Sequence, residues 1–331
     1  MAKKASEYDY LHISARVRAM ENRLLTRERM ERMLDARSAD EAAKVLAECG
    51  YGDLPSLTPT VIERALSQAR QGLLAELRKV APDQRLLDVF CIKYDYHNIK
   101  VLIKAAARGV DGAQLLLDAG RYDLAQLRED FEKGELSHTS PTFRAAAEQA
   151  REVLSQTGDP QKADFILDRA YYEELLQAAK DTGSSFLLEY ARVSIDAANL
   201  RAVVRVHRMG AGVSVLREVL VPGGSVSTDR LLSAGGGELS SLFLRTPLEE
   251  AAAIGASALE GGSLTAFERA CDNGVMSVVR TGRTVPFGEQ ALVGYLYAKE
   301  AEFTAIRVIL TGKLAGLDRS ILEERLRDSY A

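Results

Sequence analysis

The sequence has few cysteines, and none of them lies in a pattern that would build a disulfide framework or a zinc site. Cys49, Cys91 and Cys271 are odd in number and far apart, and no C-x-x-C pair occurs. The four histidines are equally scattered along the chain. We therefore expect no metal site.

The sequence also lacks a long apolar run and a strong charge of either sign. No stretch of about 18 or more apolar residues occurs, so we expect no helix of this chain to cross a bilayer. The first residues turn charged where a signal peptide would need its apolar stretch, which predicts a protein kept in the cytoplasm. A net charge of −4 argues against a protein that mainly coats nucleic acid, and no nucleic-acid partner is expected.

Signatures of catalysis are missing as well. The glycine-rich stretch VPGGSVS lacks the lysine of a phosphate-binding loop, and no nucleophile elbow, H-E-x-x-H or G-x-G-x-x-G pattern occurs. Adjacent acids such as Glu173 and Glu174 are typical of solvated helix faces, whereas acid–base chemistry needs carboxylates that converge in space. We predict no catalytic residue and no cofactor.

Helical patterns are present nearly everywhere. Apolar residues recur at helical spacing and alternating strand patterns are scarce, which predicts an all-α protein. The breakers between helices are too short to link independent domains, so we expect one all-helical domain over 1–331. The predicted helices are 11–35, 39–49, 60–80, 83–108, 141–156, 161–180, 184–208, 246–258, 263–280, 289–312 and 318–328.

One sequence pattern occurs three times. The segments are DYHNIKVLIKAAARG, DAANLRAVVRVHRMG and EFTAIRVILTGKLAG, and each has an acid first and a base five positions later. Their starts lie 101 and 106 residues apart, which is too long for the common solenoid repeats. This spacing predicts three copies of a multi-helix unit, approximately 1–111, 112–212 and 213–331.

The acid of each copy falls among apolar residues on a helical wheel. Asp95 lies beside Asn98 inside the apolar arc of the first copy, and Asp196 lies beside Asn199 in the second. The third copy keeps the acid, Glu302, without the amide. A buried charge without a partner costs several kcal/mol, so we expect an arginine, a lysine or a helix N-terminus from another helix to meet each acid.

Two interpretations of these acids are open. In the first, each acid forms a structural ion pair or cap that fixes the register of its helix. In the second, the acids line a central surface for a partner. Because the acids recur together with the repeated architecture, we favour the structural interpretation.

Basic residues occupy the opposite sides of the same helices. Residues five apart lie about 140° apart around a helix, so the acid and the base of one copy are not neighbours. A solvated face is the ordinary interpretation of such a row, but its repetition also fits contact with an acidic partner. The candidates for such contact are Lys100, Lys104, Arg201, Arg205 and Arg307.

Four stretches together resemble the C subunit of the V/A-type rotary ATPases, whose eukaryotic counterpart is the d subunit of the vacuolar ATPase. They are YLHISARVRAMENRLLT, KYDYHNIKVLIKA, SIDAANLRAVVRV and PFGEQALVGYLYAKEAEFTAIRVILTGKLAGL. They occur in the order of the family and the resemblance covers essentially the whole chain, although the region from Gly210 to Gly262 matches only loosely.

The resemblance implies a fold, a function and partners. The implied fold has three similar helical units around a pseudo-threefold axis in a funnel- or V-shaped molecule. The implied function is that of a non-catalytic rotor adaptor, a socket that joins the D and F subunits of the central shaft to the membrane proteolipid ring and passes torque for ATP-coupled H⁺ or Na⁺ transport. The family places one copy per complex, without a homo-oligomer, peripherally on the cytoplasmic face of the membrane. The alternative is a free-standing helical scaffold that binds other soluble proteins.

Overall fold

The structure is a computed structural model that describes residues 5–234 and 238–331. Within these two ranges every regular element is a helix and no strand occurs, which confirms the all-α prediction. In chain order the first elements are η1 Glu7–Tyr10, α1 Leu11–Glu21, α2 Arg27–Asp35, α3 Ala39–Lys44, η2 Val45–Cys49, α4 Pro59–Arg78, α5 Arg85–Arg108, η3 Ala113–Leu115 and α6 Leu124–Lys133. They are followed by α7 Pro141–Thr157, α8 Pro160–Thr182, α9 Ser185–Arg208, α10 Val213–Val219, α11 Thr228–Ser233, α12 Leu239–Leu242, α13 Glu249–Leu259, α14 Leu264–Arg280, η5 Thr281–Thr284, α15 Glu289–Leu314 and α16 Arg319–Arg325.

Side-chain caps and glycines set the ends of the long helices. Thr58, Ser140 and Asp159 each accept a hydrogen bond from a backbone N–H of the first turn, and each is followed by a proline that opens the helix. At the other end, Gly109 and Gly183 adopt the left-handed conformation that terminates α5 and α8. The predicted bounds of α4, α5, α7, α8, α9, α14 and α15 agree with the structure to within two residues, and α13 begins three residues later than predicted.

The prediction of a single helix over 11–35 is wrong. The chain leaves the helix between α1 and α2, where Thr26 caps α2 by accepting a hydrogen bond from the N–H of Arg29. The N–H of Leu25 is donated to Glu302, far along the chain, instead of to a helical carbonyl. Four short helices were not predicted, because segments of ten residues or fewer give little periodicity; they are α6, α10, α11 and α12.

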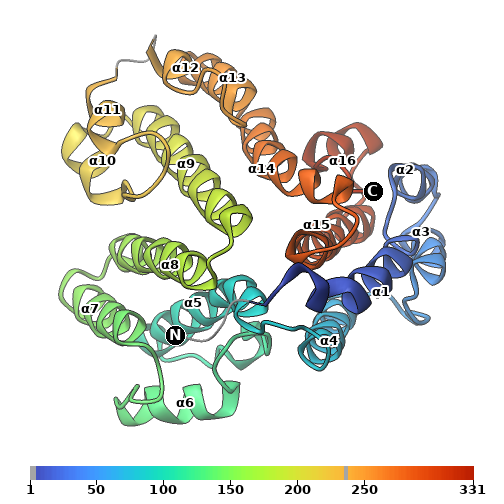
Figure 1. Cartoon of the computed structure of the whole chain (residues 1–331). Helices are drawn as coiled ribbons and strands as arrows, with labels where there is room; N and C mark the ends of the chain where they lie inside the picture. Colours follow the sequence, from blue (N-terminus) through green and yellow to red (C-terminus); the bar gives the residue numbers. More distant parts are fainter. Residues whose placement is uncertain (1–4, 235–237) are drawn as a thin grey trace.

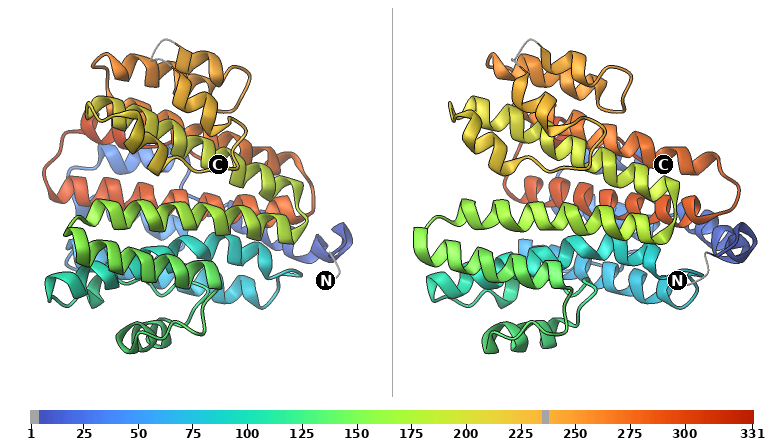
Figure 2. Two further views of the ribbon diagram at one scale, coloured as in Figure 1. Left: turned by 90° about the vertical axis from the view of Figure 1, so that its left-hand side faces the viewer. Right: turned by 60° about the vertical axis from the view of Figure 1, so that its left-hand side comes forward.

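The long helices pack side by side around a shared core. Helix α8 packs on α5, α7 and α9, while α9 also packs on α13 and α14. Helix α15 packs on α1, α4, α5 and α14. The largest cluster of buried apolar side chains draws on α1, α4, α5, α8, α9, α14 and α15. Figure 2 shows these helices roughly aligned with one another in successive layers.

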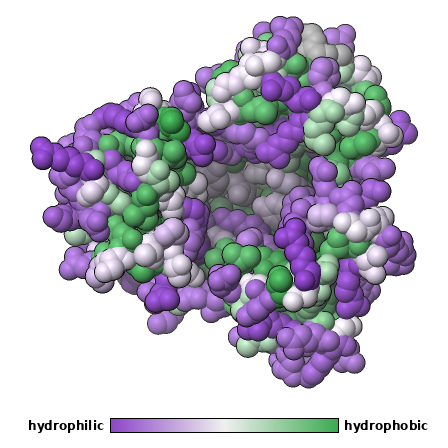
Figure 3. All heavy atoms as spheres, turned by 180° about the vertical axis from the view of Figure 1, so that it is seen from behind, coloured by the Kyte–Doolittle hydropathy of each residue, from purple (hydrophilic) through white to green (hydrophobic). Residues whose placement is uncertain are grey.

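Segments from the two ends of the sequence lie together, and the molecule has a central hollow. Helices α1 to α4 lie beside α15 and α16 in Figure 1. On the face opposite to that view the molecule is hollowed at its centre, and largely hydrophilic side chains border the hollow (Figure 3). Of the helices in the described ranges, none has the length and hydropathy needed to cross a membrane. The division into three units stays a prediction.

Candidate functional site

The predicted acids and amides are buried at the contacts between three long helices and the segments that connect other helices. Asp95 and Asn98 lie on α5, Asp196 and Asn199 on α9, and Glu302 on α15, and none of the five is more than 4% exposed. We call each acid, its amide where one is present, and the connecting segment that they bind a staple. The first staple is on α5, the second on α9 and the third on α15.

The two asparagines bind their connecting segments in the same way. The Nδ2 of Asn98 donates to the carbonyl of Leu117 and its Oδ1 accepts from the N–H of the same residue, both at 2.8 Å. Asn199 repeats both bonds with Val221, again at 2.8 Å. A carboxamide offers a donor and an acceptor side by side, so it can satisfy both polar groups of one backbone residue as a neighbouring strand would. Each asparagine thereby fixes the register of a connecting segment against a helix.

In the first staple the acid binds both backbone and side chain of the connecting segment. The carboxylate of Asp95 accepts from the N–H groups of Arg121 and Tyr122 at 2.9 and 3.4 Å, and from the Nε of Arg121 at 2.6 Å. Arg121 also pairs with Glu174 of α8 at 3.1 Å. Burial raises the pKa of Asp95 to about 6, although the Arg121 guanidinium and the backbone bonds act to lower it. The expected cation is present, but it comes from a connecting segment and not from a helix.

In the second staple the acid has no counter-ion. The carboxylate of Asp196 accepts from the N–H of Ser225 at 2.9 Å and from that of Val226 at 3.1 Å. Among the residues of 5–234 and 238–331, no arginine or lysine forms an ion pair with Asp196, so the expectation of a cation or a helix N-terminus is wrong here. Burial raises the pKa of Asp196, and the hydrogen bonds from Ser225 and Val226 oppose that shift. The two backbone donors take the place of the cation.

Both connecting segments need a glycine next to the acid. A Cβ atom at Gly120 would lie 2.1 Å from the Oδ1 of Asp95, and one at Gly224 would lie 2.1 Å from the Oδ1 of Asp196. Sequence reasoning tested the second of these segments only as a phosphate-binding loop. The acid binds the N–H of a residue that follows it by 26 positions in the first segment and by 29 in the second. A glycine directly precedes that residue in both segments, and this shared glycine was the available signal.

The third staple closes α15 onto the beginning of the chain. Glu302 accepts hydrogen bonds from the N–H of Leu25 at 2.6 Å and from the Tyr51 hydroxyl at 2.5 Å, and it pairs with Lys299 of its own helix. As in the other two staples, the bound segment leads directly into a capped helix. The caps are Asp123 of α6, Ser227 of α11 and Thr26 of α2.

All five predicted basic residues form ion pairs with acids on a neighbouring helix of the same chain. The two lysines of α5 bind α8, the two arginines of α9 bind α14, and the arginine of α15 binds α4. The pairs are Lys100–Asp168 at 2.6 Å, Lys104–Asp164 at 2.7 Å, Arg201–Glu268 at 2.6 Å with a further contact to Asp272, Arg205–Glu268 at 2.6 Å, and Arg307–Glu63 at 2.8 Å. The contact of these residues with a partner stays a prediction.

One acid that the repeated pattern did not predict joins three helices. Glu300 of α15 binds the Nε of Arg70 on α4 at 3.2 Å, and on α5 it binds the Nζ of Lys93 at 2.9 Å and the hydroxyl of Tyr94. Burial would raise the pKa of Glu300, but Lys93 and Arg70 hold it below its ordinary value. The matching positions of the other copies are Lys93 and Ser194, so recurrence could not identify this acid.

The chain was compared with known proteins over its whole length. A sequence model of the family described as ATP synthase (C/AC39) subunit matches residues 13–325. The C subunit of the V-type sodium ATPase of Enterococcus hirae is 26% identical over 325 residues, which cover 97% of this chain and 99% of that protein.

Two further relatives are about as similar. The C subunit of the A-type ATP synthase of Methanocaldococcus jannaschii is 25% identical over 93% of this chain and 84% of its own length. The C subunit of the V-type ATP synthase of Thermus thermophilus is 25% identical over 96% of this chain and 98% of its own length. The similarity therefore extends over all three staples.

Proposed function

The chain belongs to the family of ATP synthase (C/AC39) subunits, and on that premise we propose that it is the central-stalk adaptor of a V/A-type rotary ATPase. In this role it joins the D and F subunits of the shaft to the membrane proteolipid ring. It passes torque between them without catalysing a reaction itself. The observation that carries the proposal is the family match over residues 13–325, because it includes every long helix of the fold.

The proposed geometry is a socket. Three helical units, approximately 1–111, 112–212 and 213–331, surround a pseudo-threefold axis, and the hollow of Figure 3 receives the lower end of the shaft. One copy sits peripherally on the cytoplasmic face of the membrane, against the ring. The recurrence of a staple on α5, α9 and α15 supports this arrangement, since related units would carry related contacts.

A socket that transmits torque has to resist local opening. Each staple joins a long helix to the start of another helix through hydrogen bonds of buried side chains. Breaking such bonds leaves buried polar groups unpaired, at about 1–3 kcal/mol for each group. The ion pairs between neighbouring long helices add further cross-connections. These contacts make the frame stiff.

Reconstitution tests the proposed role. The purified chain is mixed with the D–F pair, and the complex is weighed by size-exclusion chromatography with light scattering. The same complex is then added to the proteolipid ring in nanodiscs. We expect one copy of the chain in each complex and binding to both partners. A chain that binds neither the D–F pair nor the ring would overturn the proposal and favour the free-standing scaffold.

A charge swap tests the separate proposal that the basic residues face the shaft. Simple reversal of Lys100 would place two acids together, because Lys100 pairs with Asp168. The double variant Lys100→Asp with Asp168→Lys keeps the ion pair and moves the positive charge to the neighbouring helix. If Lys100 meets an acidic shaft surface, the swap weakens binding and reduces its salt dependence, while the melting temperature stays the same. Unchanged binding would remove the role of Lys100 and leave the adaptor role intact.

A further inference from the structure

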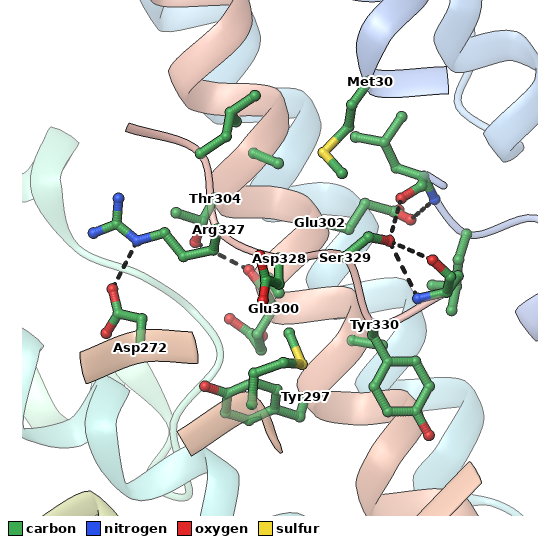
Figure 4. A pocket seen from close by; sticks show the side chains of 18 of the residues that line it. Met30, Asp272, Tyr297, Glu300, Glu302, Thr304, Arg327, Asp328, Ser329 and Tyr330 are labelled. Carbon is green, nitrogen blue, oxygen red and sulfur yellow. Dashed lines mark hydrogen bonds and ion pairs between the residues drawn. The ribbon is translucent and has the colours of Figure 1, made fainter. Parts of the chain in front are cut away.

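The segment after α16 lies across a cavity between α14 and α15. The cavity has a volume of about 240 Å³ and is lined by Asp272 and Met276 of α14 and by Tyr297 and Ala301 of α15. Residues 326–331 line it as well and have no regular secondary structure (Figure 4). We call residues 326–331 the strap, and the surface that the strap covers the groove.

Two side chains of the strap are recognised specifically. The Nε of Arg327 pairs with the Oδ2 of Asp272 at 2.7 Å. Tyr330, three residues later, is only 3% exposed and belongs to the core cluster of the long helices. Its hydroxyl approaches α15 at Gly294, where a Cβ atom would lie 2.4 Å from the oxygen. The groove therefore has an acidic subsite and an aromatic subsite at a fixed spacing.

The groove also binds the backbone of the strap. The N–H of Asp328 donates to the Oδ1 of Asn273 at 3.0 Å. The carbonyl of Ser329 accepts from Arg280, and the carbonyl of Tyr330 accepts from the Nη1 of Arg283 at 2.8 Å. Hydrogen bonds to main-chain groups combined with side-chain subsites are the features by which proteins bind extended peptides.

The groove keeps unused binding capacity. The Nε of Arg280 is buried, and within the described ranges it has no hydrogen-bond partner. The strap has no regular secondary structure and Tyr330 is its only buried side chain, so the strap can open locally without unfolding a helix. The strap is thus a bound peptide of imperfect fit, held in place by its covalent connection to α16.

We propose that the groove is a peptide-binding site and that the strap is its releasable occupant. The partner that it fits is an extended segment of another protein with an arginine and, three residues later, an aromatic residue. A short tether gives the strap an effective concentration in the millimolar range. A free segment binds only the fraction of molecules whose strap is open, and its apparent affinity is reduced by that fraction. This inference is independent of the proposed rotor role.

A labelled peptide with the strap sequence LRDSYA tests the proposal on the full chain. Arg327→Ala removes the ion pair of the strap and leaves the groove unchanged, so the open fraction rises. Because both side chains of this ion pair are partly exposed, at 30% and 38%, we expect the peptide to bind about two- to fivefold more tightly than to the unaltered chain. Hydrogen exchange of residues 326–331 accelerates by a similar factor, while exchange in α15 does not change.

Matched variants separate groove from strap. Glu324→Ala changes an exposed side chain of α16 that does not line the cavity, and it is expected to leave peptide binding unchanged. Adding Arg283→Ala to Arg327→Ala removes a side-chain donor to the backbone of strap and peptide alike, so the strap opens further but the peptide gains no additional affinity. Asp272 is avoided because it also pairs with Arg201 of α9. A peptide with alanine in place of its arginine and tyrosine is expected not to bind. The proposal is overturned if the strap peptide binds no more tightly to Arg327→Ala than to the unaltered chain.

Discussion

The first staple surrounds the carboxylate of Asp95 with an arginine as well as backbone N–H groups, whereas the second binds Asp196 with the backbone N–H groups of Ser225 and Val226 and the uncharged side chain of Ser225. The carboxylates are equally buried, at 1% and 2% exposure. A buried carboxylate in this fold therefore needs directed donors, and a counter-ion is not required. In both staples the donors come from a chain segment that runs past the helix.

The constant part of the two staples is the asparagine and the glycine. Asn98 and Asn199 make the same pair of bonds at the same distances, and Gly120 and Gly224 approach their acids equally closely. The variable part is the residue after the glycine. An arginine in that position connects the first staple to Glu174 of α8, and a serine leaves the second staple without such a connection. The asparagine thus fixes the register of the connecting segment, and the residue after the glycine decides whether the staple is also linked to a neighbouring helix by an ion pair.

The largest expected effect comes from removing the counter-ion of the first staple. Arg121→Met leaves Asp95 buried without a cation, as Asp196 is in the second staple. Removing one partner of a buried pair typically costs about 3–5 kcal/mol in the free energy of unfolding, which guanidinium denaturation would measure. A matched control is Lys100→Met, whose partner Asp168 is half exposed and whose loss is expected to cost about 1 kcal/mol or less.

The outcome decides how alike the two staples are. A loss of several kcal/mol would mean that the first staple depends on its arginine, and that the second has found other stabilisation. A loss no larger than that of Lys100→Met would show that neither staple needs a counter-ion. The two staples would then not differ in their electrostatic stabilisation.

A smaller effect is expected from the two asparagines, and it should differ between them. Asn199→Ala leaves the N–H and carbonyl of Val221 unpaired in a site that is 3% exposed, whereas Leu117, the partner of Asn98, is half-buried and within reach of water. We expect a cost of about 2–3 kcal/mol for Asn199→Ala and about 1 kcal/mol less for Asn98→Ala. Equal costs in denaturation experiments would contradict the assumed role of water at the first staple.

The helices that bear the staples could be predicted from the sequence, because acids and amides recur at matching places within periodic segments. Asp95 and Asp196 lie inside apolar arcs, and their recurrence 101 residues apart indicates a structural role. Arg121 and the two glycines could not be predicted in the same way. They lie in connecting segments of different length, 26 and 29 residues from the acids, and residue spacing in such segments has no fixed period.

The break between α1 and α2 could not be predicted from the sequence either. Residues 11–35 keep a helical pattern throughout, so local information predicts one continuous helix. The helix is broken because the N–H of Leu25 binds Glu302, which comes 277 residues later. Tertiary contact overrides local propensity here, as it does wherever a buried group finds its donor far along the chain.

The pH dependence of stability is a smaller effect, and it probes the carboxylate of the first staple. Burial raises the pKa of Asp95 to about 6, above the value of about 3.9 for an unfolded aspartate. The folded state therefore binds more protons than the unfolded state between these values. The resulting stabilisation is complete below about pH 4 and is lost as the pH rises through 6. The cost of Asp95→Asn should be about 1 kcal/mol larger at pH 5 than at pH 7, when unfolding is followed in guanidinium at both pH values.

A control without a titrating group tests the origin of that difference. Asn98→Ala alters the same staple but removes no carboxylate, so its cost should be the same at pH 5 and pH 7. If the cost of Asp95→Asn is also independent of pH, the carboxylate titrates in the folded protein as it does in the unfolded chain.

The smallest effect is expected from building the missing counter-ion into the second staple. Ser225 occupies the place of Arg121, directly after the glycine, and it is exposed. In Ser225→Arg the guanidinium can reach Asp196 as Arg121 reaches Asp95, while the N–H of residue 225 keeps its bond to the carboxylate. Among the described residues no acid is bound to the second staple as Glu174 is to the first, and the substitution removes the hydrogen bond of the Ser225 side chain, so part of the gain is lost. We expect the free energy of unfolding to rise by about 0.5–1 kcal/mol, and Ser225→Gln, similar in length but uncharged, to add none of it. A gain that disappears in 1 M salt would place the arginine at the surface, whereas a gain that persists would mean that the pair is shielded as in the first staple.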